Sequence, residues 1–105
     1  MWQYAKVVMI QSFADLATQD VFNGIPSRRG RASCPVGLWS IARRKLDQLS
    51  VAHTLEDLKA PPANRLEALK GDRKGQFSIR INDQYRICFF WTLQGPASVE
   101  IVDYH

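Results

Sequence analysis

The sequence predicts an α+β fold in which two N-terminal helices pack on one face of a curled antiparallel sheet. Two observations predict this class: helical periodicity is confined to the first half of the chain, and strand-like patterns begin only after residue 64. The 105 residues are enough for one domain. With 46% hydrophobic and 23% charged residues, the composition is that of a globular protein and excludes full-length disorder.

The N-terminal part predicts a short first strand over 9–13 and a helix over about 13–22. Ser12 followed by Asp15 resembles a helix start, because an acidic residue in the first turn is favoured by the helix dipole. Residues 24–35 contain Gly, Pro, Ser and Arg and are expected to form a loop.

A second helix is expected to begin close to Pro35 and to end near Ala52. Its apolar residues recur at helical spacing and therefore form one stripe. The members of this stripe are Leu38, Ile41, Ala42, Leu46 and Leu49.

The second half predicts a meander of three or four antiparallel strands, because apolar and polar residues alternate along it. The expected strands cover 66–69, 77–81, 85–91 and 99–104, with a turn over 70–75.

The loop between the two central strands fixes how they pair. A three-residue loop over 82–84 sets Ile79 opposite Ile87 and makes one face of the hairpin fully apolar, whereas a two-residue loop would mix the faces. The same register places Arg80 opposite Arg86 on the other face.

This pairing of like charges is unfavourable by up to about 1 kcal/mol when exposed. Two explanations stay open: a carboxylate such as Glu67 or Glu100 neutralises the two arginines, or the open face of the sheet receives an anion.

The chain is basic, with 14 Lys+Arg against 10 Asp+Glu and a formal charge of +4. A basic domain favours anionic partners, and nucleic acid is the first candidate. The turn at 70–75 adds Lys70, Arg73 and Lys74 beside two glycines, which suits a phosphate contact, although an ordinary charged turn has the same composition. Six further cations follow one another with no acid between them: Arg28, Arg29, Arg31, Arg43, Arg44 and Lys45.

Several functional classes are excluded or disfavoured. The sequence has no phosphate-binding loop, nucleophile elbow, zinc-protease motif or dinucleotide fingerprint. Cys34 and Cys88 lie too far apart for a CxxC motif, so no metal is expected, and no apolar run is long enough to span a membrane. A reduced, cytoplasmic protein is therefore expected.

His53 is expected at the surface, while Asp103 and His105 share a strand face, which permits acid–base chemistry.

Three segments together resemble the HigB toxins of the RelE/ParE superfamily: residues 61–87, the ending 99–105 and the start 9–13. The resemblance implies a single RelE-like toxin domain over 9–105, preceded by an extension over 1–8. It also implies a ribosome-dependent, metal-independent mRNA endoribonuclease with no cofactor. Its expected partners are a helix-turn-helix antitoxin of the HigA type, the 70S ribosome and mRNA, with operator DNA bound only through the antitoxin and no membrane.

The resemblance also implies roles for individual residues. Asp103, Tyr104 and His105 match the catalytic C-terminal Asp-Tyr-His of the family, and Arg73 matches a catalytic cation. Glu67 stands where some relatives carry a catalytic histidine, so it is either a proton acceptor or an ion-pair partner. The residues expected to bind RNA and the ribosome are Arg28, Arg29, Arg31, Arg43, Arg44, Lys45, Lys70, Lys74, Arg80 and Arg86.

Two alternatives remain beside the nuclease. One is a superfamily toxin without nuclease activity that inhibits DNA gyrase, as the ParE branch does. The other is a weakly active toxin that serves mainly as a co-repressor with its antitoxin.

Overall fold

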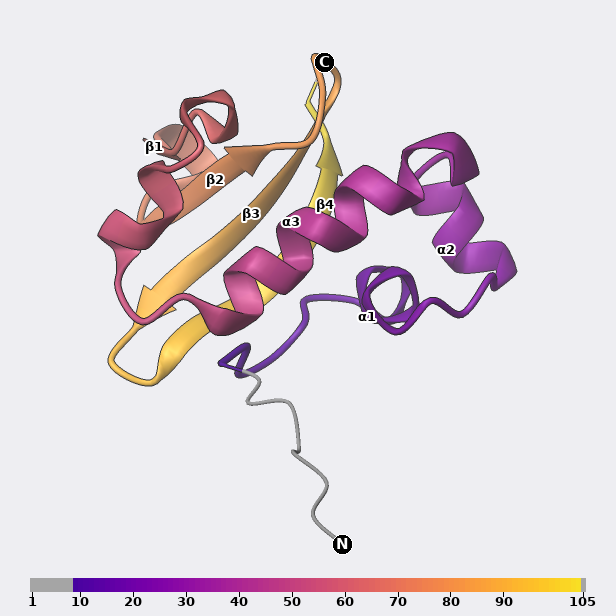
Figure 1. Cartoon of the computed structure of the whole chain (residues 1–105), viewed down its shortest axis with the longest axis horizontal. Coiled ribbons are helices and arrows are strands. Elements are labelled where there is room, and N and C mark those ends of the chain that lie inside the picture. Colours follow the sequence, from indigo (N-terminus) through magenta and orange to yellow (C-terminus); the bar gives the residue numbers. More distant parts are fainter. Residues whose placement is uncertain (1–8, 105) are drawn as a thin grey trace, which may run out of the picture.

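The computed structural model describes residues 9–104, and its helices precede its strands along the chain (Figure 1). The predicted α+β class is confirmed. The α-helices are α1 (Leu16–Asn23), α2 (Arg28–Ser33) and α3 (Trp39–Val51), with 3-10 turns η1 (Val36–Leu38), η2 (Leu55–Lys59), η3 (Pro62–Asn64) and η4 (Gly71–Arg73). The extension proposed for residues 1–8 lies outside the described residues.

The sheet has four antiparallel strands in the order β1-β2-β3-β4. Its members are β1 (Glu67–Ala68), β2 (Gln76–Arg80), β3 (Tyr85–Thr92) and β4 (Gly95–Asp103). The expected N-terminal strand contributes one isolated bridge, between Phe13 and Val99. The described part of the chain contains no helix long and apolar enough to cross a bilayer.

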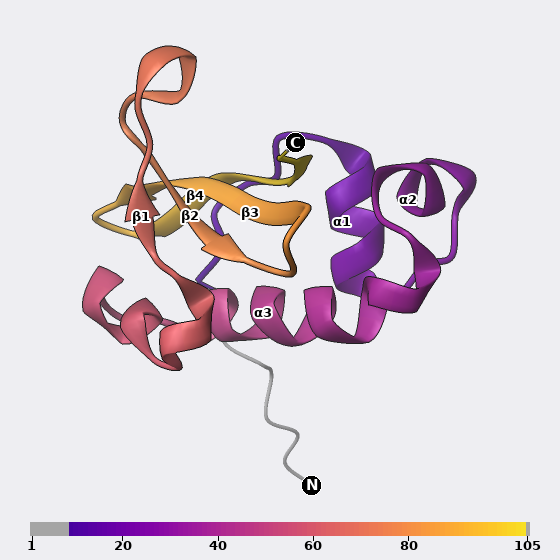
Figure 2. The same ribbon diagram turned by 90° about the horizontal axis from the view of Figure 1, so that it is seen from above.

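The long helix α3 lies across one face of the sheet, while α1 and α2 lie beside β4 (Figures 1 and 2). Leu46 and Leu49 of the predicted stripe are fully buried against the apolar face, which contributes Ile79, Ile87 and Phe89. Burying this stripe removes apolar surface from water and fixes α3 on the sheet. Among the described residues, no α-helix covers the opposite face of the sheet (Figure 2).

Helix α1 begins later than expected. Its N-cap is Asp15, whose carboxylate accepts a 2.7 Å hydrogen bond from the Thr18 amide, so Ser12 is not the start. Gly24 ends the helix in the left-handed region at φ 71°, where the lack of a side chain is an advantage. The buried Thr18 hydroxyl accepts a 3.0 Å bond from the Ile101 amide and ties α1 to β4.

The expectation of a continuous loop over 24–35 is wrong, because α2 forms inside it. Ser27 caps this short helix and accepts a 3.0 Å bond from the Gly30 amide. The buried Asp20 of α1 binds Arg29 at 2.6 Å and also accepts a bond from the Ser27 hydroxyl. These contacts between helices stabilise a six-residue segment whose own propensity is too low for a helix.

The hairpin register is the predicted one. Ile79 pairs with Ile87, and Arg80 pairs with Arg86. The pairing of β3 with β4 shifts between Cys88 and Phe90, at a bulge where Ser98 adopts a φ of 50°. The extra residue resets the alternation of β4, so that Glu100 and later alternate residues face the open side.

Candidate functional site

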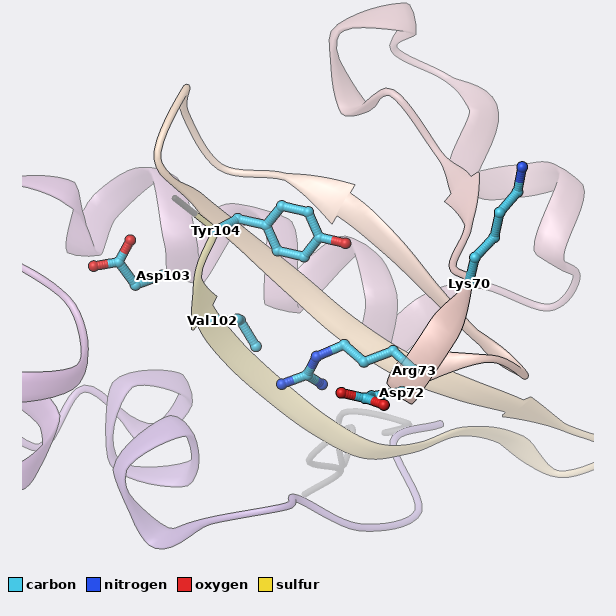
Figure 3. A pocket seen from close by; sticks show the side chains of 6 residues that line it. All are labelled: Lys70, Asp72, Arg73, Val102, Asp103 and Tyr104. Carbon is cyan, nitrogen blue, oxygen red and sulfur yellow. The ribbon is translucent and has the colours of Figure 1, made fainter.

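The open side of the sheet carries a pocket of about 560 Å³. One wall is the turn around η4, and the other is the end of β4 with the residue that follows it (Figure 3). The lining residues are Lys70, Asp72, Arg73, Val102, Asp103 and Tyr104. The pocket therefore joins two segments that the sequence singled out separately: the basic turn and the C-terminal end.

Arg86 is the best-fixed cation beside this pocket, since its side chain is only 11% exposed. Its Nε donates a 2.7 Å bond to the Ser78 hydroxyl, and its Nη2 donates a 2.6 Å bond to the Arg65 carbonyl. The guanidinium carbon lies 5.9 Å from the centroid of the Tyr104 ring, within the range of a cation–π contact. Arg86 thus connects Ser78 of the central sheet with Tyr104 after the last strand.

Arg73 reaches from the turn across the sheet toward β4 (Figure 3). Its Nη1 donates to the Glu100 carboxylate at 3.2 Å and to the Gln76 side-chain oxygen at 3.2 Å. Partial burial lowers the pKa of Arg73, but the hydrogen bond to Glu100 and nearby negative charges outweigh it and hold the pKa above its ordinary value. The Arg73 guanidinium therefore stays positively charged at neutral pH.

The two explanations for the arginine pair can now be compared. Glu67 does lie near Arg86, with 3.5 Å between the carboxylate and Nη2. Arg80 instead pairs with the exposed Asp83 in the hairpin loop. Glu100, the other carboxylate considered, binds Arg73 of the turn instead. Each arginine has a carboxylate within 4 Å, so charge repulsion alone does not require an anion.

The catalytic candidates at the C-terminal end diverge. The exposed Tyr104 ring lies over the open face, while the Asp103 carboxylate projects away from it (Figure 3). Asp103 accepts a 3.1 Å bond from the Gln84 side-chain amide, and the Tyr104 amide donates a 2.6 Å bond to the Gln84 carbonyl. These bonds anchor the end of the chain to the hairpin loop. His105 lies outside the described residues.

The cations predicted to bind RNA fall into separate groups. Lys70 lines the pocket, and the exposed Lys74 closes the same turn. Arg29 is held by Asp20 and has a structural role. Burial and the nearby Arg44 and Arg80 lower the pKa of Lys45, so these three cations lie close together. None of the following lines the pocket: Arg28, Arg29, Arg31, Arg43, Arg44 and Lys45.

Two polar residues of the site were missed by sequence reasoning. Ser78 and Gln76 hold the two arginines, and both lie in β2 on the face that carries Arg80. Period-two alternation was the signal that could have found them. Within residues 9–104, no three His, Cys, Asp or Glu side chains lie close enough to hold a metal ion.

The site combines a fixed guanidinium, a second guanidinium that reaches over the sheet, and an exposed aromatic ring. Guanidinium groups bind phosphate oxygens well because their donors are planar and always charged. An aromatic ring beside them is typical of proteins that stack an unpaired base. The arrangement therefore suits a single-stranded nucleic acid with one phosphate at the arginines.

Comparison with known proteins defines the class. The family model described as the RelE-like toxin HigB of type II toxin–antitoxin systems matches residues 18–105. The chain therefore belongs to the HigB-like family of RelE-like toxins of type II toxin–antitoxin systems.

Two relatives match parts of the chain. The chain is 47% identical over 62 residues to Toxin HigB-1 of Vibrio cholerae, which is 59% of this chain and 64% of that protein. It is 42% identical over 55 residues to an uncharacterized protein of Haemophilus influenzae, which is 52% of this chain and 54% of the relative. The matched stretches thus span less than two thirds of either relative.

Proposed function

We propose that this toxin is a ribosome-dependent endoribonuclease that cleaves mRNA and thereby inhibits translation. One observation carries the proposal: Arg73, Arg86 and Tyr104 converge on one side of the sheet, although they come from a turn, a central strand and the C-terminal end. Membership of a HigB-like toxin family supports the same class of function.

In the proposed reaction the ribose 2′-oxygen attacks the adjacent phosphorus, and the bond from phosphorus to the 5′-oxygen breaks. The products are a 2′,3′-cyclic phosphate and a free 5′-hydroxyl. A base takes the proton of the 2′-hydroxyl, an acid gives a proton to the leaving oxygen, and cations stabilise the charge that develops on the phosphate. In the proposed mechanism side chains fill these roles and no metal ion is needed.

Arg73 and Arg86 are suited to the developing charge on the phosphate. His105 is the proposed acid or base, because imidazole titrates near neutral pH, and Asp103 is proposed to orient it. Tyr104 would stack on a base or donate a proton. Glu67 is the alternative proton acceptor, at 53% exposure and 3.5 Å from Arg86.

The remaining cations are proposed to dock the toxin on ribosomal RNA. Lys70 and Lys74 extend the positive charge of the pocket along its turn. A second group consists of Lys45 with Arg44 and Arg80, and burial together with the positive charges of these arginines lowers the pKa of Lys45. Because each phosphate contact releases counterions, ribosome binding should weaken steeply as salt rises. The proposed docking residues are Arg28, Arg31, Arg43, Arg44, Lys45, Lys70, Lys74 and Arg80.

The proposal includes a helix-turn-helix antitoxin of the HigA type, through which operator DNA would be bound. Type II toxins are paired with a protein antitoxin, and the family assignment supports such a partner. We also propose that the toxin acts in the cytoplasm, where ribosomes and mRNA are found.

Toeprinting on programmed ribosomes tests the proposed function. The full-length toxin should produce new 5′ ends at the A-site codon, and His105→Ala should lose most of this cleavage. A toxin that arrests growth without cutting mRNA, but inhibits supercoiling by gyrase, would replace the proposal with the ParE-like alternative. A toxin that neither cuts nor arrests growth would favour the co-repressor alternative.

A further inference from the structure

The strongest feature that the proposed function leaves unused is the Glu100 side chain. Its carboxylate lies 3.2 Å from the Arg73 Nη1, and both side chains are about one third exposed, at 32% and 30%. Glu100 belongs to β4, opposite the fully buried Cys88 of the central strand. It therefore stands on a rigid element, whereas Arg73 stands on a short turn.

We propose that Glu100 is a positioning residue that aims the Arg73 guanidinium at the RNA phosphate. This inference rests on the proposed function. Arginine has many rotamers, and fixing a free one costs conformational entropy when the ligand binds. A carboxylate that holds the side chain beforehand removes part of that cost, which is the general advantage of a preorganised site.

The nitrogen that Glu100 uses supports this role. Both hydrogen bonds that the Arg73 side chain makes with described residues leave from Nη1, one to Glu100 and one to Gln76. Among residues 9–104, the Nη2 and Nε groups of Arg73 have no hydrogen-bond partner. Their N–H groups can therefore donate to two oxygens of one phosphate while Nη1 stays held.

Strand β4 connects Glu100 directly to the pocket. Glu100 is followed at alternate positions by Val102 and Tyr104, both of which line the pocket. The Glu100 carboxylate thus bridges the two walls, because it sits on the strand of one wall and binds the turn of the other. Removing the carboxylate would break this bridge and leave the Arg73 guanidinium with Gln76 as its remaining acceptor among the described residues.

The side-chain charge and the hydrogen bond can be separated. Glu100→Gln keeps an oxygen that accepts from Nη1 but removes the negative charge, whereas Glu100→Ala removes both. A positioning role predicts that Glu100→Ala lowers the single-turnover cleavage rate at saturating ribosomes by about 10-fold or more, and Glu100→Gln by less than about 3-fold. The ribosome concentration at half-saturation should change little in either variant.

A double-mutant cycle with Arg73→Lys decides whether Glu100 acts through Arg73. Lysine keeps the positive charge but lacks the planar guanidinium group. In the Arg73→Lys background, Glu100→Ala should therefore lower the cleavage rate by less than about 2-fold more. An equal loss in both backgrounds, or no loss in the wild-type background, would overturn the inference. Lys59→Ala is the control, because this exposed cation pairs locally with Glu56.

A second measurement tests the positioning of Arg73 without depending on cleavage. In the free full-length toxin, the nuclear magnetic resonance signal of the Arg73 Nη1–H group should be distinct, because Nη1 is held by Glu100 and Gln76. It should move toward the position of mobile arginines in Glu100→Ala but not in Glu100→Gln. An unchanged Arg73 signal in Glu100→Ala would refute the positioning role. If the wild-type toxin shows the signal of a held Arg73 but does not cleave mRNA, the proposed function is refuted instead.

Discussion

The Arg86 guanidinium lies 5.9 Å from the centroid of the Tyr104 ring, so the central strand of the sheet directly supports the last described residue. The Tyr104 amide is also bonded to Gln84 of the hairpin loop. These contacts hold Tyr104 over the open face of the sheet. The candidate site depends on that anchoring.

Replacing Arg86 by Ala should lower the single-turnover cleavage rate about 10- to 100-fold, because the phosphate loses a cation and the ring loses its support. Arg86→Lys should recover only part of the rate, since lysine cannot bind Ser78 and the Arg65 carbonyl with the same geometry. The measurement is cleavage of mRNA on programmed ribosomes, with Lys59→Ala as the control. Wild-type rates in Arg86→Ala would remove Arg86 from the site.

Asp20→Asn should lower the melting temperature at neutral pH, because the buried carboxylate holds Arg29 and Ser27. Hydrogen bonds from Arg29 and Ser27 hold the pKa of the Asp20 carboxyl below its ordinary value of 3.8. A lowered pKa stabilises the folded state above pH 3.8, and this stability is lost as the pH falls further through the folded pKa. The difference between wild type and variant should therefore shrink below about pH 4.

The contact with Asp20 predicts different effects for substitutions at the neighbouring Arg28 and Arg29. Arg29→Ala should lower the melting temperature, whereas Arg28→Ala should leave it nearly unchanged, because Arg29 binds Asp20 and Arg28 forms no ion pair with a described residue. Thermal unfolding followed by circular dichroism measures both. Equal effects of the two substitutions would show that the Asp20 contact does not stabilise α2.

Gly95→Ala should destabilise the fold by about 1–3 kcal/mol or more. Gly95 has a φ of 135°, and an added Cβ would lie 2.4 Å from the Met9 carbonyl oxygen. Gly37 is the matched control, since a Cβ there would have no neighbour within 4 Å. Gly37→Ala should stay within about 0.5 kcal/mol of the wild type in urea unfolding. A stable Gly95→Ala variant would mean that the N-terminal segment does not pack against β4.

Both thiols should be unreactive in the folded protein. Burial raises the pKa of the Cys34 thiol to about 11 and also raises the pKa of the Cys88 thiol. At pH 8 the Cys34 thiolate is then roughly one part in a thousand, and the thiolate is the reactive form. A thiol reagent at pH 8 should modify neither cysteine of the native chain but both after unfolding. Rapid modification of native Cys88 would show that this thiol is not buried in solution.

Much of the fold could be predicted from patterns that act locally. The alternation along β2 and β3 fixed the hairpin register, which the pairing of Ile79 with Ile87 confirms. The apolar residues at helical spacing along α3 likewise predicted which face of this helix is buried. Helix α2 could not be predicted, because it depends on Asp20, a partner from another helix.

The sequence by itself determined the fold class, the strand register, the toxin family and the residue types from which a phosphate site can be made. It did so because side-chain periodicity and motif spacing are properties of the chain alone. Only the tertiary structure decided which carboxylate meets which guanidinium: Glu100 binds Arg73 rather than Arg80, and Asp83 binds Arg80. The physical reason is that ion pairs form within about 4 Å, and the path of a turn across the sheet sets those distances.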